Sequence, residues 1–314
     1  MDIAFDGRTV IVTGAGNGLG RAYALEFARR AANVVVNDLG TSTSGEGTST
    51  YAADSVVDDI TGRGGRAVAS YDSVATDTGC RALAAVALDA FGRIDAVVHN
   101  AGILRNAMFD DMTDDRWFPV VDTHLFGAFF LSRVVWPVMR QQRFGRMVFT
   151  SSGSGAFGRA NGANYAAAKA GILGLCNALA LEGEEHGILA NAILPMGFTR
   201  LGGAPEDRDV SPTAEVARAA RYETIPRFHP DWVVPMVTYL ASPACTSTHC
   251  YYSAANGRYA RVFVGVTTGW YPDGDQPPTA EEIAAHLGDI DEDTEFDVPM
   301  SVYSELERIQ SRHD

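Results

Sequence analysis

Residues 9–20 read TVIVTGAGNGLG, and this stretch decides the fold class of the chain. The β-branched residues before the glycines predict a buried strand, and the stretch RAYALEF after them predicts a helix. Glycines at such a turn let the backbone approach an anion closely, and N–H groups at the helix N-terminus bind that anion. The spacing T-G-x3-G-x-G differs from the usual GxGxxG, but its place between strand and helix predicts a dinucleotide site. The predicted cofactor-binding residues of this turn are Gly14, Asn17, Gly18 and Leu19.

Short β-branched or apolar runs alternate with helical patterns along most of the chain. The predicted strands are residues 9–13, 34–37, 67–71, 96–99, 146–150, 189–194 and 261–265. The predicted helices are residues 21–31, 77–91, 113–140 and 164–182. This alternation predicts an α/β fold of the Rossmann-type, doubly wound class, a seven-stranded parallel sheet with helices on both faces. Ligands of such sheets bind beyond the carboxyl ends of the strands.

Two segments interrupt the alternation. Residues 40–50, GTSTSGEGTST, predict a mobile loop that is rich in glycine and hydroxyl side chains. Residues 196–230 combine scattered proline and arginine with a weak helical signal, and we expect them to form a lid over the substrate pocket.

The second predicted strand leads to Asp38, 24 residues after Gly14. An acidic residue at this place accepts hydrogen bonds from the adenosine ribose hydroxyls of a dinucleotide. It also repels the 2′-phosphate of NADP, by roughly 4 kcal/mol for charges 4 Å apart at an effective dielectric of 20, before screening. The next residue is Leu39, so no basic neighbour offsets this repulsion. NAD is therefore the predicted cofactor, and the structural alternative is that Asp38 only caps its strand.

Ser152, Tyr165 and Lys169 form the predicted catalytic group. Ser152 follows the fifth predicted strand, and Tyr165 and Lys169 are four residues apart, which places them on one helix face. A phenol with an ordinary pKa of about 10 is a poor base at neutral pH, but a nearby ammonium lowers that pKa by about 1–3 units. Tyr165 could then exchange a proton with a substrate hydroxyl, and Ser152 could hydrogen-bond the substrate oxygen.

Lys169 is the only lysine in the chain, and the other 24 of its 25 cationic side chains are arginine. Wherever a generic positive charge suffices, this sequence uses arginine. A compact ammonium can reach both the ribose of a cofactor and the phenol of a tyrosine, which a planar guanidinium does badly. The composition therefore favours a chemical role for Lys169 over a solvated surface position.

Acidic residues are concentrated at the C-terminal end. Residues 271–314 contain 13 acidic residues and two arginines, a net charge of −11, so residues 1–270 carry only −3 of the formal −14. We expect a Rossmann-type catalytic domain over residues 1–270 and an acidic arm over residues 271–314. Apolar residues recur along the arm, and we expect it to pack on its own or a neighbouring subunit and to help close the substrate pocket. The alternative is a solubility tail.

Composition argues against several other classes. The chain has no basic stripe for nucleic acid, no apolar run of the ~18 residues that span a membrane, and no basic-then-apolar secretory signal at its start. Its four cysteines show neither CxxC nor zinc-ligand spacing. We therefore expect reduced thiols, no metal site and a cytoplasmic location.

Together these motifs resemble the short-chain dehydrogenase/reductase family. The residues that carry the resemblance are TGAGNGLG, Asp38, Asn100-Ala101-Gly102, Ser152 and Tyr165-x-x-x-Lys169. The resemblance covers about residues 5–270. Within the family, the stretches VVVNDLG, FGRIDAVVHNAGILR and GANYAAAKAGILGL are most similar to the (3R)-hydroxyacyl-CoA dehydrogenase domain of the peroxisomal multifunctional enzyme type 2.

The resemblance implies further site residues and an oligomer. Asp72 and Ser73 would hold the adenine, and Thr199 would lie by the nicotinamide carboxamide. The cofactor would also lie along Asn100, Ala101 and Gly102. Because members of the family commonly assemble around the helices corresponding to residues 113–140 and 164–182, we expect a homodimer or homotetramer.

One position departs from the common family pattern. Many members have a catalytic Asn, thought to hold a water in a proton relay, where this chain has His124. His124 either replaces that role or is structural. The neighbouring departure, His99, is expected only to end a strand.

The predicted function is NAD(H)-dependent interconversion of a secondary alcohol and a ketone, on a 3-hydroxyacyl-CoA or a related thioester. A dehydrogenase for a steroid or another cyclic or terpenoid alcohol would use the same residues. An epimerase or dehydratase normally shows a different glycine spacing. A non-catalytic NAD-binding regulator would be expected to have lost part of the group formed by Ser152, Tyr165 and Lys169.

Overall fold

The computed structural model describes residues 3–197, 227–272 and 276–311. The chain divides into two compact units, Met1–Arg261 and Val262–Asp314. The acidic arm predicted at residues 271–314 lies within the second of these units.

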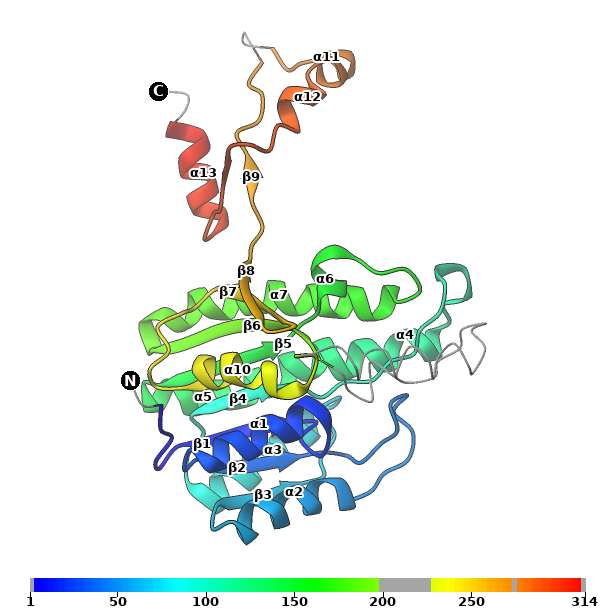
Figure 1. Ribbon diagram of the computed structural model, residues 1–314. Helices are drawn as coiled ribbons and strands as arrows, with labels where there is room; N and C mark the ends of the chain where they lie inside the picture. The colour runs from blue at the N-terminus through cyan, green and yellow to red at the C-terminus, as the bar shows by residue number, and fades with distance from the viewer. Residues whose placement is uncertain (1–2, 198–226, 273–275, 312–314) are drawn as a thin grey trace. The chain divides into compact units, whose positions relative to one another are not determined.

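An eight-stranded sheet forms the centre of the first unit, in the order β3-β2-β1-β4-β5-β6-β7-β8 (Figure 1). Its strands are β1 (Thr9–Thr13), β2 (Asn33–Asn37), β3 (Arg66–Ser70), β4 (Ala96–His99), β5 (Gly145–Thr150), β6 (Ile188–Met196), β7 (Cys250–Ala255) and β8 (Arg258–Val262). From β3 to β7, neighbouring strands pair in parallel. The strand order reverses between β1 and β4, and a crevice forms at the carboxyl ends of the strands at such a reversal. The predicted Rossmann-type fold is confirmed.

The last two strands differ from the prediction. The seventh parallel strand was expected at residues 261–265, but it is β7, which pairs with β6 from Asn191↔Cys250 to Met196↔Ala255. Asn256 and Gly257 connect β7 to β8 with positive φ angles of 50° and 78°. Two such residues form a tight hairpin turn, which joins antiparallel strands. Within the described residues the sheet therefore has eight strands: β7 was not predicted, and the predicted strand at residues 261–265 overlaps only the end of the edge strand β8.

Three helices cover one face of the sheet: α1 (Gly18–Arg29), α2 (Tyr51–Gly62) and α10 (Val234–Ala241) (Figure 1). The other face is covered by α3 (Asp77–Phe91), α5 (Gly127–Gln142) and α7 (Ala163–Gly183). Of these helices, α2 and α10 were not predicted. Because helices cover both faces, the strands are buried, as their continuous apolar runs require.

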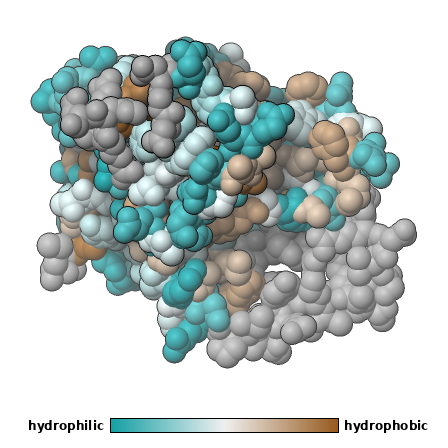
Figure 2. All heavy atoms as spheres, turned by 90° about the horizontal axis from the view of Figure 1, so that it is seen from above, coloured by the Kyte–Doolittle hydropathy of each residue, from teal (hydrophilic) through white to brown (hydrophobic). Residues whose placement is uncertain are grey.

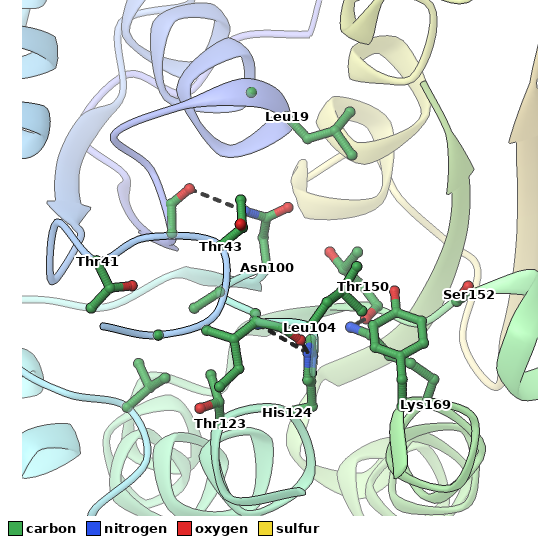
Figure 3. Close-up of a pocket in the computed structure, with 18 of the residues that line it drawn as sticks. Leu19, Thr41, Thr43, Asn100, Leu104, Thr123, His124, Thr150, Ser152 and Lys169 are labelled. Atoms are coloured by element: carbon green, nitrogen blue, oxygen red, sulfur yellow. Dashed lines mark hydrogen bonds between the residues drawn. The ribbon is translucent and has the colours of Figure 1, made fainter. Parts of the chain in front are cut away.

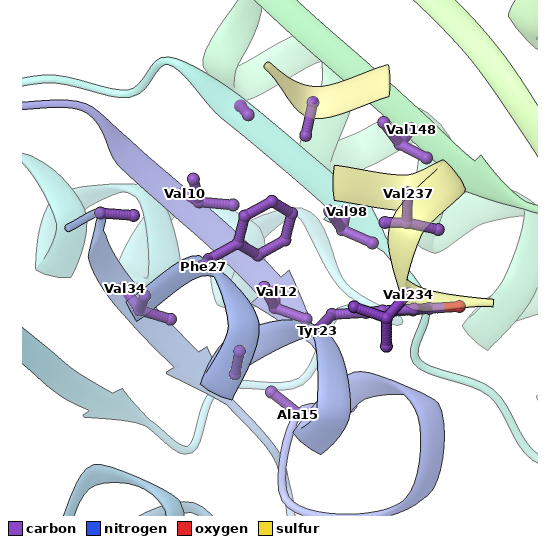
Figure 4. Close-up of a cluster of buried hydrophobic side chains, with 14 of the residues drawn as sticks. Val10, Val12, Ala15, Tyr23, Phe27, Val34, Val98, Val148, Val234 and Val237 are labelled. Carbon is purple, nitrogen blue, oxygen red and sulfur yellow. The ribbon is translucent and has the colours of Figure 1, made fainter. Parts of the chain in front are cut away.

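The main hydrophobic core lies between α1, α10 and the sheet (Figure 4). Tyr23 and Phe27 of α1 are fully buried there with Val10 of β1, Val98 of β4 and Val237 of α10. Burying side chains of this size contributes roughly 1.5–3 kcal/mol each. This packing fixes α1, and with it the glycine-rich turn that precedes it, against the carboxyl ends of β1 and β4.

A continuous helical stretch, Asp114–Gln142, is made of α4 (Asp114–Val121), the π-helical turn η2 (Asp122–Phe126) and α5. By length and composition alone it could cross a membrane. In this fold α4 and η2 pack on α7, and α5 packs on α3. These contacts bury part of the apolar stretch, while Phe126 and Phe129 remain exposed. On the face drawn in Figure 2, hydrophilic and hydrophobic residues are interspersed.

Over residues 262–272 and 276–311, the second unit shows two short strands and three helices. Strand β9 (Val266–Thr267) pairs antiparallel with β10 (Phe296–Asp297), and the helices are α11 (Ala280–Ala285), α12 (Leu287–Ile290) and α13 (Val302–Ser311). A capping box between Thr279 and Glu282 starts α11, and Trp270 stacks on His286 with ring centroids 4.2 Å apart. The arm thus has local structure, while its packing on a subunit stays a prediction.

Candidate active site

A cavity of about 1030 Å³ opens at the carboxyl ends of the parallel strands (Figure 3). Its volume lies at the upper end of the range of roughly 300–1,000 Å³ for ligand pockets. The predicted site residues that line it are Gly14, Asn17, Gly18, Leu19, Asp38, Asp72, Ser73, Asn100, Ala101, Gly102, His124, Ser152, Tyr165 and Lys169. The remaining predicted site residue, Thr199, lies outside the described residues. The fold therefore brings residues from across the chain into one site.

The glycine-rich turn has the shape that a dinucleotide requires. Gly14 has a φ of 62°, and a Cβ atom there would lie 2.8 Å from the Cα atom of Ala101. A Cβ atom on Gly20 would lie 2.1 Å from the carbonyl oxygen of Gly14. Asn17 precedes α1 in an extended conformation and makes no side-chain cap, which leaves first-turn N–H groups for a ligand. The residues at this end of the cavity therefore fit a pyrophosphate.

Thr13 and Asn100 hold this turn against the end of β4. The Thr13 hydroxyl accepts hydrogen bonds from the N–H groups of Asn100 and Ala101, both at 3.0 Å. The Asn100 side chain donates to the carbonyl oxygens of Thr13 at 3.0 Å and Gly14 at 3.2 Å. The sequence reading did not single out Thr13. The only signal for it was its position directly before the first glycine.

Asp38 lies at the end of β2 with both carboxylate oxygens engaged. Its Oδ2 accepts from the Gly16 N–H at 2.8 Å, and its Oδ1 accepts from the Gly40 N–H at 2.7 Å. A Cβ atom on Gly16 would lie 2.8 Å from that Oδ2. The carboxylate is thus fixed in place beside the glycine-rich turn and lines the cavity. Asp72 lines the same end, and its carbonyl oxygen accepts from Asn37 Nδ2 at 2.9 Å.

Ser152, Tyr165 and Lys169 come together from two neighbouring elements. Ser152 follows β5 and caps the short helix α6 (Gly153–Phe157), its Oγ accepting from the Ser154 N–H at 3.1 Å. Tyr165 and Lys169 lie one turn apart on α7, with the Lys169 Nζ 5.5 Å from the centre of the Tyr165 ring. Lys169 is only 2% exposed, and its Nζ donates to the Thr150 carbonyl oxygen at 2.5 Å.

Burial dominates the acid–base properties of this group. It raises the pKa of the Tyr165 phenol, while a hydrogen bond with Ser152 and the positive charge of Arg159 lower it. Burial also lowers the pKa of Lys169 to about 7. We expected the ammonium of Lys169 to lower the pKa of Tyr165, but here the opposing effects come from Ser152 and Arg159. A pKa of about 7 means that Lys169 changes its charge near neutral pH.

His124 lies in the π-helical turn η2 and is 1% exposed. Its ring meets the Tyr165 ring edge to face, with centroids 5.1 Å apart, and its Nε2 is 2.9 Å from the Ile103 carbonyl oxygen. Burial lowers the pKa of His124 well below its usual value, so the ring is neutral. A Cβ atom on Gly102 would lie 2.2 Å from His124 Cε1, which explains the glycine there. His99 ends β4, as expected, and burial lowers its pKa to about 3.

The hydroxyl-rich loop of residues 40–50 also reaches the cavity. Thr41, Ser42, Thr43 and Gly45 line it. Backbone hydrogen bonds shape the loop, among them Ser42 N–H to the Glu46 carbonyl oxygen at 2.8 Å, and its predicted mobility stays a prediction. Figure 3 shows Thr41 at one side of the cavity and Ser152 and Lys169 at the other. The sequence reading did not assign this loop to the site.

The comparisons with known proteins agree with this geometry. The short chain dehydrogenase profile matches residues 8–202, and the chain belongs to the short-chain dehydrogenase/reductase family. The class of protein defined by the fold and the site is thus an oxidoreductase that acts on CH–OH groups. Enzymes of this family use NAD or NADP, and they are commonly oligomeric.

Three relatives place the chain within that family. Mouse peroxisomal multifunctional enzyme type 2 is 46% identical over 245 residues, which are 77% of this chain but 31% of that enzyme. A hydroxyacyl-CoA dehydrogenase of Mycobacterium tuberculosis is 38% identical over 77% of this chain and 75% of its own length. A crystal structure of a short chain dehydrogenase from Mycobacterium avium superimposes with a TM-score of 0.76 at 34% identity, covering 91% of this chain and 95% of that chain. The chain therefore spans about a third of the multifunctional enzyme.

Proposed function

We propose that this protein interconverts a secondary alcohol and a ketone with NAD(H), with Tyr165 as the general acid and base. The observation that carries the proposal is the meeting of Ser152, Tyr165 and Lys169 with Asp38 in one cavity. A regulator that only bound the dinucleotide would not need a buried lysine beside a buried phenol, because burying an ammonium is costly.

Each of the three residues has a distinct task in this mechanism. Bound NAD would supply the acceptor for the hydride that leaves the alcohol carbon. In the oxidation, Tyr165 Oη takes the hydroxyl proton of the substrate, and in the reduction it returns a proton to the ketone oxygen. The Ser152 hydroxyl holds the substrate oxygen as its charge changes. Ser152 and Arg159 are the groups that lower the pKa of Tyr165, and Lys169, fixed by the Thr150 carbonyl oxygen, adds positive charge to the site when it is protonated.

The preference for NAD over NADP rests on Asp38. Its carboxylate is held by two backbone N–H groups and therefore cannot turn away from a ribose placed beside the glycine-rich turn. A ribose with free hydroxyls would donate hydrogen bonds to it, whereas a 2′-phosphate would be repelled.

We propose a 3-hydroxyacyl-CoA or a related thioester as the substrate. The support is the similarity to a hydroxyacyl-CoA dehydrogenase over about three quarters of both chains. The same chemistry on a steroid or another cyclic alcohol is the main alternative outcome of the test below.

A substrate panel tests the proposal. The purified protein is mixed with NADH and 3-oxoacyl-CoA, a cyclic ketone or a simple ketone, and NADH absorbance is followed. We expect oxidation of NADH with the thioester, and a loss of about 10²- to 10⁴-fold in kcat in Tyr165→Phe with NADH affinity retained. Normal turnover by NADH-saturated Tyr165→Phe, or binding of NADH without turnover on any ketone, would contradict the mechanism.

Two further predictions concern the whole protein, and a third concerns His124. We propose a homodimer or homotetramer, and exposed aromatic residues on the outer side of the helical stretch, Phe126 and Phe129, agree with an interface there. We propose a cytoplasmic location, in line with the four free cysteines. His124 is proposed as a contact that holds the Tyr165 ring, with a relay role as the alternative.

A further inference from the structure

Residues 103–106 follow β4, and all four line the cavity. This short irregular segment holds the hydroxyl-rich loop. The Leu104 N–H donates to the Thr43 carbonyl oxygen at 2.9 Å. The Arg105 side chain donates from Nε to the Ser44 carbonyl oxygen at 2.8 Å and from NH1 to the Asp115 carbonyl oxygen at 2.7 Å. Arg105 thus joins the loop to the start of α4.

Asn164 holds the same segment from the other side. It is 0% exposed and precedes Tyr165 in the first turn of α7. Its Nδ2 donates to the carbonyl oxygens of Arg105 and Arg116, both at 2.8 Å, and its Oδ1 accepts from the Tyr165 N–H at 2.7 Å. Both N–H groups and the carbonyl oxygen of the amide are therefore in use. An amide is the side chain that offers two donors and one acceptor in this arrangement.

These bonds form a continuous path from the loop to the catalytic tyrosine. The path runs from Ser44 through the side chain and then the carbonyl group of Arg105 to the side chain of Asn164, and from there to the backbone of Tyr165. Neither Arg105 nor Asn164 takes part in the proton transfer described above. Each is held by polar bonds with fixed directions, so the path offers a physical route by which a displacement of the loop would reach the first turn of α7.

We propose that Arg105 and Asn164 are positioning residues that make the placement of the Tyr165 phenol depend on the seating of residues 41–45 over a bound dinucleotide. The inference rests on the proposed function for its kinetic consequences only. A dinucleotide that draws the loop inward would, through Arg105 and Asn164, fix the first turn of α7. Tyr165 would then be best placed for proton transfer only when the cofactor is bound.

Hydrogen–deuterium exchange tests the coupling without any substrate. In the wild type, saturating NADH should slow exchange in peptides covering residues 40–50 and 162–168 together. Arg105→Lys keeps the charge but cannot donate from two nitrogens at once. In this variant NADH should still slow exchange around residues 14–20, while the slowing at residues 162–168 is lost. The matched control is Arg63→Lys, an exposed residue that should behave as the wild type. Unchanged coupling in Arg105→Lys would overturn the proposal.

Kinetics provide the second measurement. Asn164→Asp keeps the size and an acceptor but removes both N–H donors, and kcat should fall by about tenfold or more with the NADH dissociation constant within about threefold. The pH dependence of kcat should also shift, because Tyr165 would be displaced from Ser152. Asn164→Asp with normal kcat and pH profile overturns the proposal. A wild type that binds NADH and shows the exchange coupling, yet reduces no ketone, contradicts the proposed function and leaves the coupling established.

Discussion

Lys169 is a buried cation, and its replacement should raise the stability of the protein while lowering its activity. Burial lowers its pKa from 10.5 to about 7, so between these pH values the unfolded chain binds more protons than the folded one. Stability therefore rises with pH across this window, and the full cost of the buried ammonium is present below pH 7. Since one pKa unit corresponds to about 1.36 kcal/mol, burying the ammonium costs about 5 kcal/mol. Removing Lys169 would leave the Thr150 carbonyl oxygen without a partner, which costs about 1–3 kcal/mol. The first cost is the larger, so removing the ammonium should stabilise the fold.

Lys169→Met should accordingly stabilise the protein by a few kcal/mol below pH 7, and the gain should shrink towards pH 10. The variant should have little activity. Urea unfolding at pH 6.5 and pH 9.5 measures the difference, with the wild type at both pH values as the control. A gain that does not depend on pH would show that Lys169 is not buried as a cation.

Lys169→Arg keeps the charge and tests why this chain retains a single lysine. A guanidinium is larger and planar, and it cannot occupy the enclosed place of the Nζ atom beside Thr150 and Tyr165. We expect kcat to fall by about 10²-fold or more, with NADH binding measured separately by fluorescence. Activity within about twofold of the wild type would mean that the lone lysine is a coincidence of composition.

Asp38→Ala should change the choice of cofactor. Removing the carboxylate removes the repulsion of a 2′-phosphate, roughly 4 kcal/mol before solvent and salt screening. We expect the ratio of kcat/KM with NADP to kcat/KM with NAD to rise by about 10- to 100-fold, mainly through the KM values. The measurement compares both cofactors at one salt concentration. A wild-type preference for NADP would contradict the assignment of Asp38.

At the scale of elements, the segment that follows β4 packs closely against the His124 side chain of the π-helical turn η2. A Cβ atom on Gly102 would lie 2.2 Å from His124 Cε1, and the histidine cannot move freely because its Nε2 lies 2.9 Å from the Ile103 carbonyl oxygen. Gly102→Ala should therefore displace η2 and destabilise the fold by about 1–3 kcal/mol, the usual cost of overpacking a core.

The matched control is Gly174→Ala on the exposed side of α7, where nothing lies within 4 Å of the added Cβ. There alanine should stabilise the helix by up to about 1 kcal/mol. Urea unfolding of both variants gives the comparison. Equal free energies of unfolding for Gly102→Ala and the wild type would show that the His124 side chain can move aside without cost.

The sequence predicted the inner elements better than the outer ones. Strands β1 and β4 and helix α3 begin and end where expected, because apolar runs and helical periodicity are local signals. Helix α2 was not predicted, because it directly follows the hydroxyl-rich loop in the sequence. Strand β7 was missed because its sequence CYYSAA becomes a strand through its pairing with β6, which lies 54 or more residues earlier in the chain.

At the scale of the whole molecule, the second unit has exposed apolar side chains. Those exposed by at least 40% include Ile283, Leu287, Phe296, Met300, Val302, Tyr303 and Leu306. Side chains of this kind are typical of a segment that packs elsewhere, since a solvating tail would lack them. The prediction that the arm packs on its own or a neighbouring subunit and helps to close the substrate pocket follows from this composition.

Truncation after Val262 tests that prediction and leaves β8 complete. The cut should follow β8 and not Trp270, because β9 would otherwise remain without its partner β10. We expect a lower oligomer mass or a higher KM for the substrate, with the KM for NAD less affected. Light scattering gives the mass, and the two KM values are measured separately. Unchanged mass and unchanged KM values would leave the arm as a solubility tail.

The sequence by itself determined the fold class, the dinucleotide turn, Asp38 and the group of Ser152, Tyr165 and Lys169, because each is written in a short stretch or in a fixed spacing along one helix. Only the tertiary structure decided the burial of Lys169, the neutral state of His124, and the path through Arg105 and Asn164. These depend on atoms from segments far apart in the chain, and local periodicity contains no information about which carbonyl group an amide will meet. A pKa likewise depends on how much water the completed fold excludes, which no single stretch of sequence specifies.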